Sequence, residues 1–234
     1  AGAEIGDYMT SHPSVNLVSF TGGDTGLSVA KKANMAPLQM ELGGKDACLV
    51  LPDADVRLAA SAVAKGGFSY SGQRCTAVKL VLAFAEVADE LVELVCAKIE
   101  ALRVGRPEED ADITALVSKR SADFVQGLVE DAVAKGASLK QPWRREDNLV
   151  WPVLVDHVTS EMRLAWEEPF GPVVPVVRVT TEAEALRFVN ESKYGLQGCV
   201  FTRSVDDAIR VADQDALVMA HYLLRFEGLF LGSS

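Results

Sequence analysis

The sequence predicts an α/β fold with a largely parallel sheet. Short apolar runs alternate with stretches of helical periodicity along the chain, which is typical of that fold class. Glycine turns at residues 22–26 and 43–44 separate the first of these runs. The apolar runs are short, as over residues 80–85, and stay far below the roughly 20 residues that a membrane-spanning helix needs.

Composition narrows the class further. The 234 residues suffice for one large domain, or for a domain plus part of another. With 23 basic and 33 acidic side chains, the net charge of −10 argues against nucleic-acid partners and against binding to anionic membranes. Cys48, Cys96 and Cys199 lie in apolar runs and are expected as reduced core residues, which favours a cytoplasmic protein. The chain begins without Met or a signal-peptide pattern, so we expect a fragment.

Up to residue 51, the pattern predicts strand, glycine turn, helix and two further strands. The first apolar run predicts a strand because it leads directly into the turn Gly22-Gly23-Asp24-Thr25-Gly26. A helical pattern follows that turn, and a second glycine pair separates the next two strands. The predicted strands are residues 15–20, 38–42 and 47–51, and the predicted helix is residues 27–36.

The next helix is predicted from a cap and a periodicity. Asp53 has a side chain suited to the N-cap position. Apolar residues then follow at the i, i+3, i+4 and i+7 spacing of one helix face, and the glycine pair at 66–67 should end the helix. The residues with that spacing are Val56, Ala59, Ala60 and Val63.

The remaining chain continues the alternation. Pro175 lies inside one predicted strand, and because proline has no N–H to donate, that strand should be irregular or lie at a sheet edge. The predicted strands are residues 77–84, 149–155, 173–179 and 196–202; the predicted helices are 87–102, 118–135 (closed by Gly136), 182–190 and 205–213; residues 107–112 are expected as a polar loop.

Cys75 is the one cysteine in a polar, flexible setting, within the segment Tyr70-Ser71-Gly72-Gln73-Arg74-Cys75-Thr76. A catalytic thiol must be accessible and must reach the thiolate state. Gly72 lets the backbone approach a substrate, and the positive charge of Arg74 favours the thiolate. The pattern indicates a catalytic cysteine, and an inert loop cysteine is the alternative.

Glu41 and the first glycine turn are weaker candidates. Glu41 ends an apolar strand, where apolar neighbours would raise the pKa of its carboxyl toward that of a general base; a salt bridge to Lys45 or an exposed strand end is the alternative. The turn at residues 22–26 joins a strand to a helix, whose N-terminal amides can bind phosphate; a tight turn with an Asp or Thr cap is the alternative.

The segment Glu167-Glu168-Pro169-Phe170-Gly171-Pro172 puts two acids before a rigid turn. A carboxylate there would accept a hydrogen bond from a sugar hydroxyl, and Phe170 would pack on a flat ring. A solvated acidic turn with a core phenylalanine is the alternative. His12, His157 and His221 show no metal-ligand spacing, so no metal site is expected.

Together, the motifs FTGGDTG, ELGGK, GQRC and EEPFGP resemble, in this order, the aldehyde dehydrogenase family. Cys75 follows Glu41 by 34 residues, which suits the family's arrangement of base and nucleophile. Residues 67–79 and 162–172 are most similar to the family's NADP-dependent, non-phosphorylating glyceraldehyde-3-phosphate dehydrogenase branch, above all in plants. The resemblance covers about residues 2–216.

The resemblance implies a role for each motif. Cys75 would be the nucleophile that forms a thiohemiacetal and then a thioester, and Glu41 would activate the water that hydrolyses it. The N–H of Cys75 would help to bind the oxyanion. Arg74 would bind the substrate phosphate, with Gln73 and Thr76 also in the substrate site. The cofactor-binding residues would be Gly22, Gly23, Asp24, Thr25, Gly26, Leu42, Glu168 and Phe170.

It also implies the substrate, cofactor and domains. Glyceraldehyde 3-phosphate, a small phosphorylated aldehyde, would be oxidised to 3-phosphoglycerate with NADP (NAD is the alternative) by a full-length homo-oligomer in cytoplasmic glycolysis. Residues 1–42 would be the C-terminal remnant of a Rossmann-like dinucleotide-binding domain, 43–216 the catalytic domain and 217–234 a divergent tail. Three alternatives stay open: a catalytically silent fragment, a general NAD-linked aldehyde dehydrogenase and a thioesterase-like hydrolase.

Overall fold

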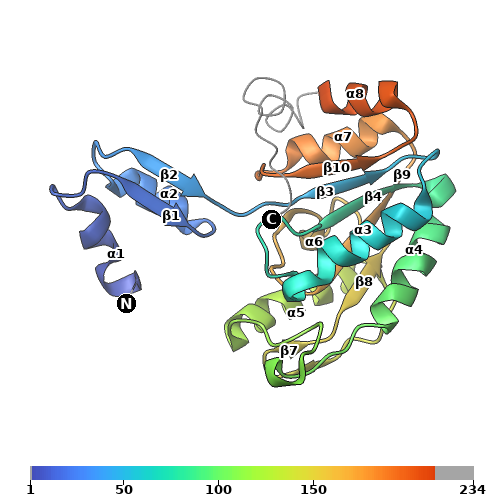
Figure 1. Ribbon diagram of the computed structural model, residues 1–234, viewed down its shortest axis with the longest axis horizontal. Helices are drawn as coiled ribbons and strands as arrows, with labels where there is room; N and C mark the ends of the chain where they lie inside the picture. The colour runs from blue at the N-terminus through green and yellow to red at the C-terminus, as the bar shows by residue number, and fades with distance from the viewer. Residues whose placement is uncertain (1, 214–234) are drawn as a thin grey trace. The chain divides into compact units, whose positions relative to one another are not determined.

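The structure is a computed structural model that describes residues 2–213 of the chain (Figure 1). It divides into two compact units, of which unit 1 ends at Gly43 and unit 2 begins at Gly44. The predicted divergent tail at residues 217–234 lies outside the described residues. Among residues 2–213, no helix is long and apolar enough to cross a lipid bilayer.

Unit 1 is a strand–helix–strand element preceded by a helix. The helix α1 spans Gly2–Ser11, and the pattern of residues 2–11 had not predicted it. It is followed by β1 (Val18–Thr21), α2 (Thr25–Lys32) and β2 (Leu38–Glu41). The two strands pair in parallel, with Val18 opposite Leu38. The buried apolar side chains of this unit are few: Val18, Val29 and Ala33.

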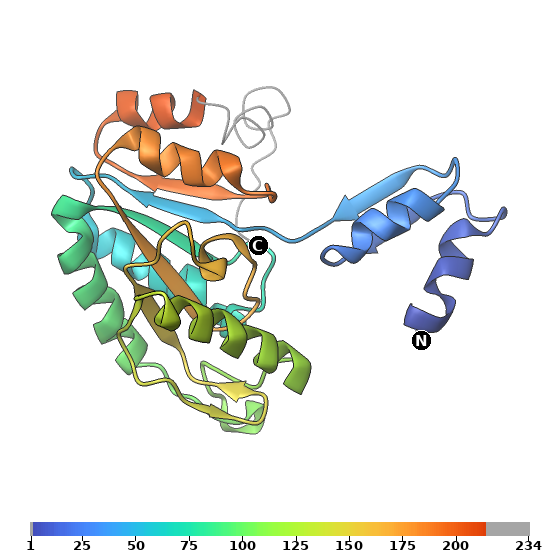
Figure 2. The ribbon, with the colours of Figure 1, turned by 180° about the vertical axis from the view of Figure 1, so that it is seen from behind.

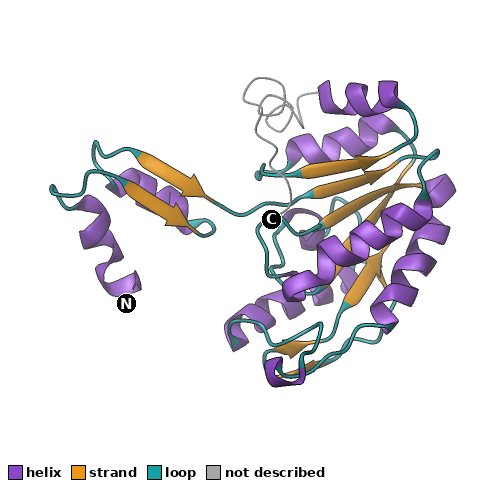
Figure 3. Cartoon of the chain, viewed as in Figure 1, coloured by secondary structure: helices purple, strands orange, loops and turns teal. Residues whose placement is uncertain are grey.

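Unit 2 is built on a six-stranded sheet in the order β10-β3-β4-β9-β8-β5. Its strands are drawn in orange in Figure 3. The strand pairs are parallel except for β5 with β8, so the predicted α/β fold with a largely parallel sheet is confirmed. A separate hairpin is formed by β6 (Arg145–Glu146) and β7 (Leu149–Val150). The sheet strands are β3 (Ala47–Val50), β4 (Leu80–Phe84), β5 (Ser138–Leu139), β8 (Val153–Asp156), β9 (Val173–Val179) and β10 (Gly198–Phe201).

Helices cover both faces of this sheet. Figures 1 and 2 show α3 and α4 on one face and α5, α6 and α7 on the other. The buried residues of these layers form one continuous apolar core. The helices of unit 2 are α3 (Val56–Phe68), α4 (Ala85–Glu100), α5 (Lys119–Ala134), α6 (Arg163–Trp166), α7 (Glu182–Glu191) and α8 (Val205–Asp213).

The cap of α3 differs from the prediction. Asp55, not Asp53, is the N-cap, because its side chain accepts a hydrogen bond from the N–H of Leu58, three residues on. Asp53 instead accepts hydrogen bonds from the Thr202 hydroxyl and the N–H of Arg203, which follow β10. Two aspartates two residues apart share the same local pattern, so only the tertiary contact separates their roles.

The strand with Pro175 was predicted to be irregular or to lie at a sheet edge. It does not lie at an edge, because β9 has β4 on one side and β8 on the other. The pairing with β8 covers Val173–Pro175 and the pairing with β4 covers Val176–Val179. The proline therefore stands where the pairing passes from one neighbour to the other, and its missing N–H costs the ladder little. The strand predicted at residues 149–155 is likewise divided, since the N–H of Trp151 joins the hairpin by bonding the carbonyl of Arg144.

Candidate active site

The loop that carries Cys75 has an unusual backbone. Tyr70, Ser71 and Gly72 are consecutive left-handed residues, with φ of 54°, 57° and 68°. Such values are uncommon for residues with a side chain, and runs of them persist only where the surroundings hold them. A Cβ on Gly72 would lie 2.2 Å from the carbonyl oxygen of Gly171, so glycine is required where this loop meets the turn after Pro169.

Hydrogen bonds to residues 114–117 hold the loop. The N–H of Thr114 donates to the buried Ser71 hydroxyl at 2.8 Å, and the N–H of Val117 donates to Gln73 Oε1 at 2.9 Å. The side chain of Gln73, predicted to bind substrate, is thus engaged in fixing the loop. Its role toward a substrate stays a prediction.

Cys75 is exposed at the end of this loop, as a nucleophile must be. Its neighbour Arg74 is half-buried and fixed by bonds to the hydroxyls of Ser69 and Thr76, both at 3.2 Å. The guanidinium also lies 5.7 Å from the centre of the Tyr70 ring. The loop therefore presents one thiol beside one immobilised cation.

A buried lysine lies behind the thiol. Lys79 Nζ donates to the carbonyl oxygen of Cys75 and forms ion pairs with Asp46 at 3.2 Å and Glu168 at 2.9 Å. Asp46 and Lys79 stand side by side because they directly precede the paired strands β3 and β4, where Ala47 is opposite Leu80. Glu168 Oε1 also accepts a bond from the N–H of Gly44 at 3.4 Å.

Burial shifts the pKa values of two charged residues next to Lys79, namely Lys45 and Asp46. Lys45 Nζ donates to the carbonyls of Leu164 and Glu167, and burial together with the nearby charge of Lys79 lowers its pKa to about 7. Burial raises the pKa of Asp46 to about 6, although Lys79 opposes this. Lys45, Asp46 and Lys79 were not predicted as site residues. The available signal was a charge directly before each of two apolar strands.

The turn at residues 167–172 is not the solvated acidic turn with a core phenylalanine that was one alternative. The Glu168 side chain is only 12% exposed, whereas Phe170 is exposed and adopts a left-handed φ of 46°. The turn therefore offers an aromatic face to solvent and keeps its second carboxylate fixed, as the other alternative requires.

Unit 1 carries the remaining predicted residues. The N–H of Gly22 donates to the carbonyl of Glu41, and a Cβ on Gly26 would lie 2.5 Å from the Leu42 side chain, so α2 packs closely on Leu42. Glu41 is exposed within unit 1, so the described part of this unit does not supply the apolar surroundings predicted for its carboxyl. Gly23, Asp24 and Thr25 are exposed as well. Because Glu41 and Cys75 belong to different units, their juxtaposition stays a prediction.

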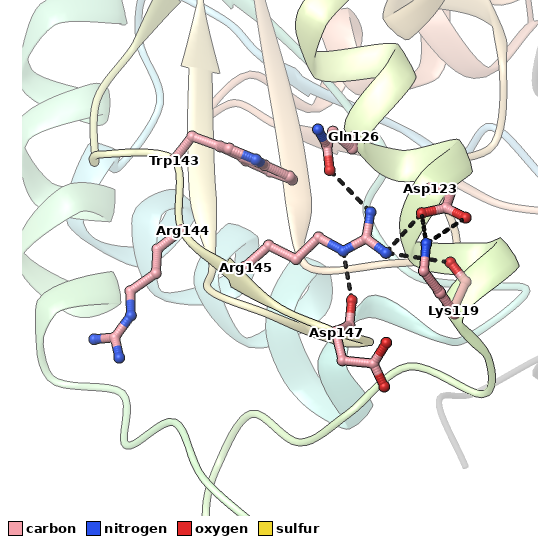
Figure 4. Close-up of a pocket in the computed structure, with 7 residues that line it drawn as sticks. All are labelled: Lys119, Asp123, Gln126, Trp143, Arg144, Arg145 and Asp147. Atoms are coloured by element: carbon pink, nitrogen blue, oxygen red, sulfur yellow. Dashed lines mark hydrogen bonds and ion pairs between the residues drawn. The ribbon is translucent and has the colours of Figure 1, made fainter.

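Two surface pockets lie elsewhere in unit 2. The first, of about 620 Å³, lies between α5 and the β6–β7 hairpin, and its centre is occupied by Arg145, which binds Gln126, Asp123 and the carbonyl of Asp147 (Figure 4). The second, of about 500 Å³, lies beside the end of α4 and includes Trp151. Neither is lined by a residue predicted for the site.

Known proteins place the chain in one family. The model of the aldehyde dehydrogenase family matches residues 1–221. An NADP-dependent glyceraldehyde-3-phosphate dehydrogenase of Arabidopsis thaliana is 62% identical over 212 residues, which are 91% of this chain and 43% of that protein. One of Scenedesmus vacuolatus is 66% identical over 171 residues, 73% of each chain. The chain thus spans less than half the length of the Arabidopsis relative and about three quarters of the Scenedesmus one.

Solved structures agree. The NADP-dependent glyceraldehyde-3-phosphate dehydrogenase of Bacillus halodurans, solved with NADP, superposes with a TM-score of 0.89 at 49% identity, over 91% of this chain and 45% of that one. A glyceraldehyde-3-phosphate dehydrogenase of Methanocaldococcus jannaschii, also solved with NADP, has a TM-score of 0.87 at 34% identity, over 91% and 47%. By sequence and by fold, the chain belongs to the aldehyde dehydrogenase family.

Proposed function

We propose that the protein containing this chain oxidises glyceraldehyde 3-phosphate to 3-phosphoglycerate with NADP, without inorganic phosphate. The observation that carries the proposal is the exposed Cys75, fixed on a strained loop beside the immobilised Arg74. The names of the relatives at about 60% identity support the same substrate and cofactor.

In this proposal, Cys75 attacks the aldehyde carbon and forms a thiohemiacetal. The backbone N–H of Cys75 stabilises the oxyanion. The carbon must then lose its hydride, for which bound NADP would be the acceptor, and the thiohemiacetal thereby becomes a thioester. Glu41 activates a water molecule that cleaves this thioester, releasing the carboxylic acid and the free Cys75 thiol. Because water is the acyl acceptor, no phosphate is consumed. The exposure of Glu41 is compatible with a base that exchanges protons with solvent.

Arg74 would bind the phosphate of the substrate. A guanidinium has five N–H donors in a planar fork that matches phosphate oxygens. The bonds to Ser69 and Thr76 hold the fork in place next to the nucleophile. An anionic substrate suits this fixed cation better than an unphosphorylated aldehyde, which is why the general NAD-linked enzyme is the weaker proposal.

The residues for NADP fit the group chemically. The turn at residues 22–26 leads into α2, and its exposed Gly23 lets a pyrophosphate approach the backbone amides, beside Asp24 and Thr25. Leu42 supports this turn through Gly26. The Glu168 carboxylate would accept hydrogen bonds from the ribose hydroxyls, and the exposed Phe170 would contact the nicotinamide ring. When bound, NADP would supply the acceptor for the substrate's hydride.

In this proposal, the complete protein is a homo-oligomer that acts in glycolysis in the cytoplasm. Nucleic acids and membranes are not among its partners.

The test is an assay of NADPH formation by the protein in its complete natural form. We expect turnover of glyceraldehyde 3-phosphate without phosphate or coenzyme A. Arg74→Gln should lower kcat/KM for this substrate by about 10–100-fold more than kcat/KM for unphosphorylated glyceraldehyde, which is the worth of a charge-assisted bond to the phosphate. A requirement for phosphate or coenzyme A, or an equal loss with both substrates, would contradict the proposal.

A further inference from the structure

Lys79 has a complete set of partners drawn from three segments. Its ammonium has three N–H donors, and three acceptors surround it: the carbonyl oxygen of Cys75, Asp46 Oδ2 and Glu168 Oε1. The side chain is 2% exposed, so these partners replace all but a trace of its hydration. A buried ammonium with one acceptor per donor has one well-defined position.

The three partners come from parts of the chain with different predicted roles. Asp46 directly precedes the sheet strand β3, Cys75 is the proposed nucleophile, and Glu168 is the proposed ribose-binding carboxylate. The loop and the turn also meet at a second point, where Gly72 packs against the carbonyl of Gly171. Two contacts between the same two segments fix their relative position more firmly than either contact alone.

We propose that Lys79 is a positioning residue that links the Glu168 carboxylate to the nucleophile loop through the Cys75 carbonyl. The inference rests on the proposed function, because that function assigns Cys75 and Glu168 their roles. The third partner, Asp46, directly precedes β3, so its ion pair with Lys79 anchors the link to the sheet.

The link has an electrical consequence with a definite sign. Lys79 is a cation bonded to the peptide of Cys75, so it favours the thiolate over the thiol. Glu168 is an anion that partly neutralises Lys79, so it weakens that effect. The other charged groups around the cluster are Lys45, Asp46 and Glu167, with Arg74 next to the thiol. Changes at Lys79 and at Glu168 should therefore alter the reactivity of Cys75 in opposite directions.

The experiment measures alkylation of Cys75 by iodoacetamide in the 234-residue chain at neutral pH, followed by mass spectrometry of the peptide that contains it. Lys79→Met should slow the alkylation about tenfold, because the loop loses both a bond to the Cys75 carbonyl and a nearby positive charge. Glu168→Gln, which keeps the shape of the side chain, should speed it about threefold. Lys79→Arg should restore the rate to within about threefold of the parent.

A matched control removes a cation elsewhere. Arg178→Met leaves the buried Asp156 without its guanidinium, at a distance from the loop along β9, and should leave alkylation of Cys75 unchanged. A merely structural role for Lys79 would slow Cys75 alike in Lys79→Met and Glu168→Gln, or leave both unchanged, and either result overturns the proposal. If Lys79→Met does not fold by circular dichroism, the sign of the Glu168→Gln effect decides.

A substrate-protection experiment on the protein in its complete natural form separates this proposal from the proposed function. Glyceraldehyde 3-phosphate should protect Cys75 from alkylation in the parent form of that protein if Cys75 is the nucleophile. Protection in the parent with no effect of either substitution would contradict the role of Lys79 alone. A lack of protection would contradict the proposed function, whatever the variants do.

Discussion

Asp46 and Asp156 are both buried carboxylates of unit 2, but their surroundings affect them in opposite ways. Burial raises the pKa of Asp46 to about 6, and Lys79 only partly offsets it. Burial also acts to raise the pKa of Asp156, yet bonds from Arg178 and from the N–H of His157 hold it below its usual value. Asp46 bonds Lys79, which also bonds the Cys75 carbonyl, whereas Asp156 ends β8 in the scaffold.

The difference comes from how the partner cation is shared. Arg178 donates Nε and one terminal nitrogen to the two oxygens of Asp156, at 3.1 Å and 2.9 Å. Lys79 divides its three donors among Asp46, Glu168 and the Cys75 carbonyl. Residues whose pKa is raised by burial and only partly restored by a shared cation are concentrated at functional sites. In unit 2, the buried carboxylate at the candidate site, Asp46, is thus less fully stabilised by its cation than the buried carboxylate of the scaffold, Asp156.

The largest expected effect that distinguishes the site from the scaffold comes from substituting a glycine in each. Gly72 in the site loop and Gly136 near the scaffold both have a positive φ, of 68° and 99°. Gly72→Ala should lower the free energy of unfolding by about 3 kcal/mol or more, since strain adds to a clash with the Gly171 carbonyl. Gly136→Ala should cost only about 1 kcal/mol, because no atom lies within 4 Å of its added Cβ. Urea unfolding measures both, and equal costs would show that the loop is not locked onto the turn.

A smaller effect tests the charges. Because the pKa of Asp46 is raised, its folded state binds more protons than its unfolded state between about pH 4 and pH 6. Its contribution to stability is therefore full below pH 4 and is lost as the pH rises through 6. The unfolding free energy of the parent minus that of Asp46→Asn should fall by on the order of 2 kcal/mol from pH 4 to pH 7.

Asp156→Asn is the matched control with the opposite sign. The pKa of Asp156 is lowered, so its contribution is present above about pH 4 and is lost on acidification through the folded value. The difference between the parent and Asp156→Asn should thus rise with pH in the acid range. Differences of the same sign for both aspartates would break the comparison.

Most of the fold could be predicted from local patterns, and the misses are instructive. The helix at Val205–Asp213 and the strand at Val173–Val179 match the predicted bounds, because an amphipathic face or an apolar run is visible in the sequence. Of the two positions predicted from Pro175, the sheet edge is not found, whereas an irregular position agrees with the change of pairing partner after Pro175. Strand order depends on which neighbour pairs at each residue, and no local pattern contains that information.

The site divides in the same way. Cys75, Gly72 and Arg74 could be selected because a polar, glycine-containing segment marks a loop. Lys79 and Asp46 could not, since they are 33 residues apart and meet only through the register of β3 and β4. The roles of Glu41 and of the turn at residues 22–26 stay predictions, because both belong to unit 1.

The most direct test of the central claim uses the protein in its complete natural form and follows the four cysteines of this chain during alkylation, with and without glyceraldehyde 3-phosphate. Cys75 is exposed, Cys96 and Cys199 are half-buried, and Cys48 is buried. We predict that Cys75 reacts first, at least about tenfold faster than the others, and that the aldehyde slows only Cys75. Alkylation of Cys96 or Cys199 at the same rate, with no protection of Cys75 by the aldehyde, would contradict its role as the nucleophile.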